Sequence, residues 1–554
     1  MNNVKKWLSL SLAGAMLMGA LAGCGGGRSA SSPSPSGSPA PSESASAPTS
    51  TILRWGTDSE PTGFDPHTNS EEASLRVMNQ PYETLVSRNE DMTFYGRLAE
   101  SWEIPDETTY IFHLRQGVKF HSGREMTADD VVYTFDRILG KTEAGDIGAL
   151  GSKASYYGGV ASVEAVDPYT VKFTLAEPNA AFLGNLTSNY GAIVDKDVIA
   201  EKGDLMRADG GTGPFQLGEW LPDNYVTITK FSDYWEADRV KLDGITYFLI
   251  GDEAARLAAL RTGEIDFASL SATNVTAAEK EANLKVISYQ TNDYIAVGCN
   301  LSTPALQDKN VRQAMSYAMD RAAIINVVYG GQALPCSMVP PAMGHWSLDV
   351  SDMDLYQTNV EKARELMEAA GYSDSNRLTL RVAAGLMDSI RQAAVVLQQQ
   401  LAEIYIDLEI TNLESGEYVD IWGKMSTPEA GFDLMIVNDG AGTDPNRSLS
   451  FFFGTGAGAN VFGFSNERVD ELCALGIATT DEAQREEYYN EAQLICIDDC
   501  TKICIASPMK YFVTASYVEG FAPSAAETHS TRVRSRSMPR KSSMENRSVM
   551  RRRA

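Results

Sequence analysis

Apolar and polar residues alternate over residues 109–114, Thr-Tyr-Ile-Phe-His-Leu, and this period of two is typical of a half-buried β-strand. Residues 129–139 repeat their apolar positions with the helical period instead, so they predict a helix. Thr127 stands just before this helix, where a side-chain oxygen can accept hydrogen bonds from free backbone N–H groups. Ser122 and Gly123 supply a turn between the two patterns. We therefore expect two strands followed by a helix within residues 98–139.

The rest of the chain alternates between predicted strands and predicted helices. Strands are expected at residues 51–56, 219–229, 294–300, 378–383, 407–411, 432–437 and 511–514, and helices at residues 252–262, 309–328, 360–370, 389–404 and 481–497. Gly371 follows the third of these helices, where a glycine suits the C-terminal cap. Because a chain of 554 residues is too long for one core, this order predicts an α/β protein with more than one domain.

The N-terminus has the pattern of an export signal. Lys5 and Lys6 precede an apolar run over residues 7–21, and Leu-Ala-Gly-Cys follows at residues 21–24. This order indicates a lipoprotein signal peptide at residues 1–23, with Cys24 as the lipidated mature N-terminus. The apolar run is shorter than the ~20 residues that span a bilayer. An uncleaved anchor or an ordinary secretory signal is the alternative. Residues 24–50 are rich in Gly, Ser, Pro and Ala, which predicts a flexible tether.

Charge separates the body of the chain from its end. The whole chain has a formal net charge of −26, and the acidic residues concentrate in residues 51–527. Such a body repels nucleic acid and anionic membrane surfaces, so we expect no nucleic-acid partner. Residues 528–554 are instead rich in Arg and Ser and have no apolar period. We interpret this basic tail as the result of a frameshift or sequencing error; a genuine tail that contacts anionic lipid is the alternative.

Motifs for catalysis and for metal binding are missing from the sequence. We find no GxSxG, HExxH or Walker-type loop, and the five histidines are scattered, so we expect no enzyme, no catalytic residues and no cofactor. Cys496, Cys500 and Cys504 would share one face of a helix if the helix at residues 481–497 continued through them. We interpret them as buried free thiols rather than a metal site, because zinc sites favour closer pairs and further ligands.

Several motifs together carry a resemblance to a known family. They are Leu-Ala-Glu-Ser-Trp at residues 98–102, Phe-His-Leu-Arg at 112–115, Gly-Val-Lys-Phe at 117–120, Thr-Ala-Asp-Asp-Val at 127–131, Gly-Thr-Gly-Pro-Phe at 211–215, Asp-Tyr-Trp at 233–235 and Val-Arg-Gln-Ala-Met-Ser-Tyr-Ala-Met-Asp-Arg at 311–321. The chain resembles, over about residues 51–523, the extracellular solute-binding proteins of ABC importers, family 5, which includes oligopeptide, dipeptide and nickel binders.

The resemblance implies a two-lobed fold of the class II periplasmic-binding-protein type, with an extra small subdomain on lobe one. Lobe one would cover residues 51–298, with the subdomain at about 80–206, and lobe two would cover residues 299–505. Residues 506–527 would return to lobe one. The ligand would be enclosed between hinged lobes.

The resemblance also places ligand contacts on loops, and we predict Asp58, Ser59, Asn300, Asn438 and Asp439 as ligand-binding residues. Peptide-binding relatives hold the ligand ammonium with an aspartate at the position of Ala441, so Asp439 is the candidate substitute; an ordinary turn-stabilising role for Asp439 is the alternative. The arginine that dipeptide binders use for the ligand carboxylate falls on Ala384 and Gly385, although Arg381 and Arg391 lie nearby. The histidine usual in nickel binders is replaced by Asn446.

The resulting prediction is a lipid-anchored, extracytoplasmic and monomeric receptor. It would capture a small solute, with a peptide favoured, and deliver it to an ABC permease and ATPase complex. A metal chelate or an oligosaccharide as the ligand, a sensor or adhesion lipoprotein, and a secreted hydrolase are the alternatives.

Overall fold

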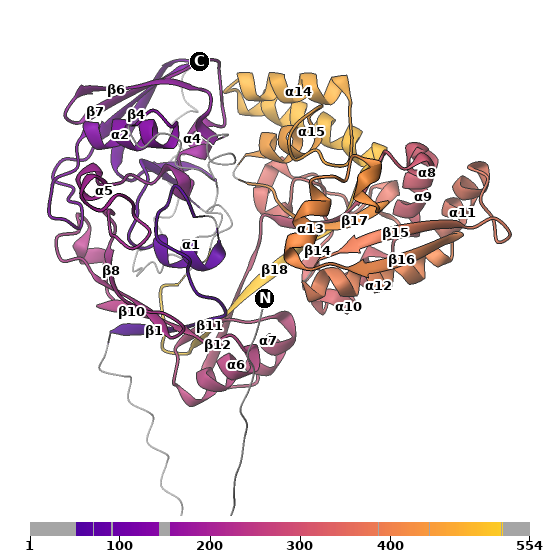
Figure 1. Cartoon of the computed structure of the whole chain (residues 1–554), viewed down its shortest axis with the longest axis horizontal. Coiled ribbons are helices and arrows are strands. Elements are labelled where there is room, and N and C mark those ends of the chain that lie inside the picture. Colours follow the sequence, from indigo (N-terminus) through magenta and orange to yellow (C-terminus); the bar gives the residue numbers. More distant parts are fainter. Residues whose placement is uncertain are drawn as a thin grey trace, which may run out of the picture. The chain divides into compact units, whose positions relative to one another are not determined.

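A computed structural model describes residues 51–69, 71–89, 92–142, 156–385, 387–442, 444–521 and 523 (Figure 1). The predicted signal peptide, the Cys24 lipidation site, the tether and the basic tail at residues 528–554 lie outside these residues. For the part that is described, the elements alternate between helices and strands. The α/β class predicted from the sequence is therefore confirmed.

One continuous sheet runs through the described residues and is shared by two halves of the protein. Its strands, in order across the sheet, are β16 (Ile406–Asn412), β15 (Leu378–Ala384), β17 (Leu434–Gly440), β13 (Asp293–Cys299), β18 (Lys502–Ala515), β11 (Phe267–Ser269), β1 (Ile52–Thr57), β10 (Gly244–Leu249), β9 (Tyr225–Lys230) and β8 (Phe215–Leu221). Two further strands, β12 (Leu284–Gln290) and β14 (Ala333–Leu334), pair with β18. We call the part built on β1 and β8–β12, together with the smaller separate sheet described below, lobe one, and the part built on β13 and β15–β17 lobe two.

The long strand β18 belongs to both lobes. Its first residues pair with β13 of lobe two, and its last residues, from Met509 to Ala515, pair with β12 of lobe one (Figure 1). The chain also crosses between β12 and β13 through Thr291 and Asn292. The Gln290 side-chain amide donates to the Ser507 carbonyl at 2.9 Å, so the two crossing segments are hydrogen-bonded to each other.

Lobe one is held by an aromatic core around Trp55 and Phe267, whose ring centroids are 4.2 Å apart. Its helices are α1 (Glu72–Met78), α4 (Phe182–Asn185), α5 (Lys196–Lys202), α6 (Glu253–Thr262) and α7 (Ala272–Ala278). The stretch predicted as one strand at residues 219–229 is instead parts of two strands, β8 and β9, because Asp223 adopts a left-handed backbone (φ 59°) that turns the chain. A Cβ on Gly211 would collide with the Pro81 carbonyl, so that glycine permits close backbone packing.

A separate sheet with its own core carries the hairpin predicted at residues 98–139. It contains β4 (Ala99–Asp106), β5 (Thr109–Leu114), β7 (Thr170–Leu175) and β6 (Val160–Asp167), in that order, with β2 (Val86–Arg88) and β3 (Phe94–Gly96) paired beside it. The helix α2 (Ala128–Ile138) follows, and Thr127 and Asp130 cap it reciprocally. The predicted strand–helix order is confirmed to within one residue for β5 and α2.

Lobe two surrounds its strands with helices. They are α8 (Pro304–Gln307), α9 (Lys309–Ala318), α10 (Arg321–Tyr329), α11 (Val360–Ala369), α12 (Asp388–Ala402), α13 (Ser415–Trp422), η6 (Arg447–Phe451), α14 (Glu467–Ala478) and α15 (Glu482–Asp499). The single helix predicted at residues 309–328 was wrong, because the Asp320 carboxylate caps a new helix by accepting from the Ala323 N–H at 2.9 Å. The three cysteines do not share a helix face either: α15 ends at Asp499, Cys500 is its left-handed C-cap and Cys504 lies on β18.

Candidate functional site

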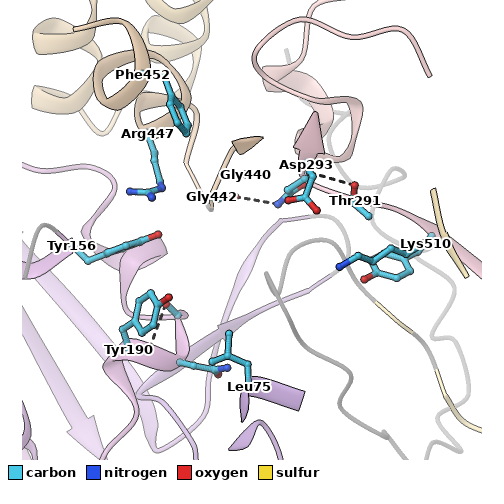
Figure 2. A pocket seen from close by; sticks show the side chains of 14 residues that line it. Leu75, Tyr156, Tyr190, Thr291, Asp293, Gly440, Gly442, Arg447, Phe452 and Lys510 are labelled. Carbon is cyan, nitrogen blue, oxygen red and sulfur yellow. Dashed lines mark hydrogen bonds between the residues drawn. The ribbon is translucent and has the colours of Figure 1, made fainter. Parts of the chain in front are cut away.

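A cavity of about 220 Å³ lies where the two lobes and the crossing segments meet (Figure 2). Lobe one contributes Leu75 and the tyrosines Tyr156 and Tyr190 to its wall. The crossing segments contribute Thr291, Asp293 and Lys510, and lobe two contributes Gly442, Arg447 and Phe452. A solute in this cavity would therefore contact both lobes and the segments that connect them.

One end of the cavity carries a cation held by aromatic rings. The Arg447 guanidinium lies 4.9 Å from the Tyr156 ring centroid and 4.3 Å from the Phe451 ring centroid. Figure 2 shows it above Tyr156. Gly442, at φ 75°, leaves room for the Arg447 side chain, because a Cβ at this position would collide with it. Stacking of this kind fixes the plane of a guanidinium without using its N–H donors.

The other end of the cavity carries charges of both signs. Lys510 is half-buried and its ammonium lies 3.4 Å from a Glu72 carboxylate oxygen. Burial lowers the pKa of Lys510, but the negative charges of Glu72 and Asp293 outweigh it, so the pKa is raised overall. Asp293 begins β13 and pairs in register with Gly440 of β17. This end of the cavity is thus suited to a polar or charged group of a solute.

The predicted contacts Asp58 and Ser59 do not line this cavity. Both are exposed; Ser59 donates a hydrogen bond to the Asp58 carboxylate at 2.9 Å, and Asp58 forms an ion pair with Arg76 at 3.2 Å. Ser59 borders a much smaller cavity in lobe one, about 10 Å³ in volume. Their role as ligand contacts stays a prediction.

The side chain of Asn300 makes hydrogen bonds within lobe two. It is fully buried, and its side-chain amide donates to the carbonyls of Thr427 and Phe432 at 3.3 and 3.0 Å. Its side-chain oxygen accepts from the Ser302 N–H at 2.9 Å. These bonds tie the end of β13 to neighbouring loops of lobe two, and Asn300 is not part of the cavity wall.

Asn438 and Asp439 lie on β17 itself. The sequence had instead suggested a loop after this strand. Asn438 is exposed, whereas the Asp439 carboxylate is buried and forms an ion pair with Lys502 at 2.7 Å. The Lys502 ammonium is surrounded by rings, at 4.3 Å from Phe452 and 5.5 Å from Phe462. Asp439 already has a cationic partner in the protein, and its role as an ammonium anchor stays a prediction.

The positions that depart from the peptide-binder pattern are packed into lobe two. Ala441 is buried and its N–H donates to the Asn292 carbonyl at 2.9 Å. Ala384 is buried at the end of β15. The side chain of Arg381 is 52% exposed and lies 3.5 Å from Asp433, and the Arg391 guanidinium donates to the Gly385 carbonyl at 3.3 Å. Neither arginine lines the cavity.

Sequence reasoning missed Arg447, Asp293, Lys510 and the cavity tyrosines. Arg447 did leave a signal, since it is the one charged residue in the stretch Asn-Arg-Ser-Leu-Ser-Phe-Phe-Phe at residues 446–453. Asp293 and Lys510 come together only through the crossing of β12, β13 and β18, and Tyr156 and Tyr190 reach the same cavity from lobe one. No local pattern encodes either arrangement.

The described residues show neither a metal-binding cluster nor a membrane-spanning helix. Among these residues, no group of three or more His, Cys, Asp or Glu side chains is placed to hold a metal ion. None of their helices combines the length and apolar character that crossing a membrane requires.

Two α/β lobes joined by crossing strands, with a cavity where they meet, define a solute-binding protein of the two-lobed periplasmic type, and solved structures of that type match the chain. Residues 93–460 match the family model described as bacterial extracellular solute-binding proteins, family 5 middle. The chain therefore belongs to family 5 of these proteins and is a substrate-binding protein of ABC transporters, not an enzyme.

Individual relatives agree with this assignment. The oligopeptide-binding protein AppA of Bacillus subtilis is 29% identical over 490 residues, which cover 84% of this chain and 88% of AppA. The glutathione-binding protein GsiB of Escherichia coli is 29% identical over 442 residues, which cover 78% of this chain and 84% of GsiB. The crystal structure of the ABC transporter substrate-binding protein CtaP from Listeria monocytogenes is 27% identical, with a TM-score of 0.75, and the match covers 85% of this chain and 95% of CtaP.

Proposed function

We propose that this protein is a membrane-anchored receptor that captures a small peptide-type solute between its lobes and delivers it to an ABC permease and ATPase complex. The observation that carries the proposal is the cavity lined by both lobes and by the crossing segments. Relatives whose names include oligopeptide and glutathione binding support a peptide-type ligand. Lipidation of Cys24 would hold the receptor at the outer face of the membrane through acyl chains, followed by the tether at residues 24–50.

The crossing segments provide the mechanism of capture. The hinge would lie at Thr291–Asn292 and at Ser507–Pro508, where the chain leaves one lobe for the other. Pro508 has no N–H, which removes one ladder hydrogen bond at this point of β18. Because a solute in the cavity contacts both lobes, it binds their closed arrangement more tightly and shifts the population toward it. The closed form would be the one that docks on the permease, as a monomer.

Thermal unfolding of the purified chain against a panel of solutes tests this function. The panel contains alanine peptides of two, three and nine residues, their C-terminal amides, glutathione, a nickel–histidine chelate and maltotriose. A solute that binds only the folded state at a hundredfold excess over its Kd stabilises the protein by about 2.7 kcal/mol. We expect the short peptides to raise the melting temperature. A chain that no member of the panel stabilises would contradict the proposal, and a shift by maltotriose or the chelate alone would replace the peptide with that class.

A further inference from the structure

Arg447 is a half-buried cation in the cavity wall that has no anionic partner among the residues that the structure describes. Other arginines nearby are paired: Arg485 donates to both carboxylate oxygens of Asp444 at 2.8 Å, and Arg76 pairs with Asp58 at 3.2 Å. Arg447 contacts aromatic rings instead, and the N–H groups of its guanidinium donate no hydrogen bond to any residue that the structure describes. A guanidinium in such a position lacks the hydrogen-bond acceptors that its donors need.

The chemistry of the guanidinium indicates what the missing partner is. Its planar fork of N–H donors matches the two oxygens of a carboxylate and forms two parallel charge-assisted hydrogen bonds. The rings of Tyr156 and Phe451 hold the fork from lobe one and from lobe two, respectively. A carboxylate bound there would contact Arg447 of lobe two while it lies against a tyrosine of lobe one.

The size of the cavity and the residues at its opposite end restrict the class of ligand further. The volume of about 220 Å³ is below the ~300–1,000 Å³ of pockets for drug-sized ligands, so the cavity suits a short molecule. The Asp293 carboxylate lines the other end, where it can accept hydrogen bonds from an ammonium in addition to those it already makes. Figure 2 shows Arg447 and Asp293 on different sides of the cavity.

We propose that Arg447 binds the terminal carboxylate of a di- or tripeptide and makes the protein select peptides with a free C-terminal carboxylate over their C-terminal amides. This inference rests on the proposed function and names the ligand class of the same cavity. Lys510 is the rival anchor in the cavity, but its ammonium is already paired with Glu72 at 3.4 Å.

Calorimetric titration of the full chain with matched probes tests the inference. The probes are L-alanyl-L-alanine, tri-L-alanine and their C-terminal amides, which differ only in the charge that Arg447 would contact. For the unaltered protein we expect the acids to bind at least about tenfold more tightly than the amides, since hydrogen bonds to charged groups contribute ~1.5–3 kcal/mol. Arg447→Gln should bind the acids about ten- to a hundredfold more weakly and bind acid and amide alike.

Three further variants make the test specific. Arg381→Gln removes a lobe-two arginine outside the cavity and should bind like the unaltered protein. Lys510→Gln should keep the preference for acids. Arg447→Lys keeps the charge but loses the fork, so it should retain part of the preference. A melting curve of each ligand-free variant shows whether it is folded.

The outcomes separate the inference from the function on which it rests. A preference for acids that survives in folded Arg447→Gln, or that Lys510→Gln abolishes, overturns the role of Arg447. Equal binding of acids and amides by the unaltered protein, or binding of neutral solutes alone, overturns the carboxylate class and leaves the receptor function intact. A protein that binds no probe and no other solute of the panel contradicts the proposed function itself.

Discussion

The ion pair between Asp439 and Lys502 yields the most direct prediction, because it decides whether Asp439 supports the fold or waits for a ligand. The two charges are 2.7 Å apart, and their side chains are 9% and 2% exposed. Asp439→Asn removes the negative charge and leaves the Lys502 ammonium buried. Breaking a buried pair from one side costs ~3–5 kcal/mol, because the remaining charge is left without compensation.

The rings around Lys502 limit this loss without abolishing it. A cation near an aromatic face gains about 0.5–2 kcal/mol, and Phe452 lies 4.3 Å from the Lys502 ammonium. We therefore expect Asp439→Asn to lower the free energy of unfolding by about 3 kcal/mol. Lys502→Met should cost a similar amount, and the double variant should cost less than the two single changes together, because neither charge then remains unpaired.

Urea denaturation followed by far-ultraviolet circular dichroism measures these differences. Asp58→Asn is the matched control: its ion pair with Arg76 is at the surface, with the Asp58 side chain 54% exposed, so it should change stability by less than about 1 kcal/mol. If Asp439→Asn stays within about 0.5 kcal/mol of the unaltered protein and peptide binding is lost, the reasoning is refuted. Asp439 would then be a ligand contact, as the sequence had suggested.

Three further predictions concern other groups. Burial lowers the pKa of His121, but hydrogen bonds to Asp209 and to the Gly213 carbonyl raise the pKa overall. The protonated His121 should therefore contribute its full stabilisation below the ordinary histidine pKa of ~6.5, and this stabilisation should be lost as the pH rises through the raised pKa. Melting curves of His121→Gln between pH 5 and 9 should lack this pH dependence. A variant with the same pH dependence as the unaltered protein would contradict the role of His121. Burial raises the pKa of the thiols in the described part of the chain, to about 12 for Cys473. Iodoacetamide should therefore label these cysteines only after denaturation. Mass spectrometry of the Cys24→Ser variant, which lacks the N-terminal thiol, measures this labelling. Labelled palmitate should enter the protein in a bacterial host and should not enter Cys24→Ser; equal incorporation in both would exclude a lipid at this cysteine.

The elements whose periods are local could be predicted from the sequence alone. Residues 109–114 were expected as a strand and form β5, and the helix expected at residues 389–404 is α12, Asp388–Ala402. The errors arose where polar residues interrupt a continuous apolar pattern. Asp320 divides the predicted helix at residues 309–328, and the turn at Asp223 divides the predicted strand at residues 219–229. In both places, cap or turn chemistry overrides the hydrophobic period.

The surroundings of the predicted site residues could not be derived from the sequence, for a physical reason. Family patterns place ligand contacts by position along β17. Whether the Asp439 carboxylate is already paired, however, depends on Lys502, which is 63 residues away in sequence. Asn300 likewise has its amide donors occupied by carbonyls more than a hundred residues further on. Arg447 was overlooked because nothing in its own stretch shows that it lies over the ring of Tyr156 of lobe one. Contacts between distant segments decide which polar residues remain available.

These contacts also explain how one small solute could control the arrangement of two large lobes. Lobe one and lobe two meet where the Ala180 N–H donates to the Ile477 carbonyl at 2.8 Å and where Arg447 stacks on Tyr156. Moving a two-state equilibrium from 1:99 to 99:1 needs about 5.5 kcal/mol of differential binding. Two charge-assisted hydrogen bonds to Arg447 and one to Asp293, at ~1.5–3 kcal/mol each, supply about that amount if they form only in the closed arrangement. A ligand that lacks its carboxylate would lose most of this difference, so the same interaction that selects the solute would also drive closure.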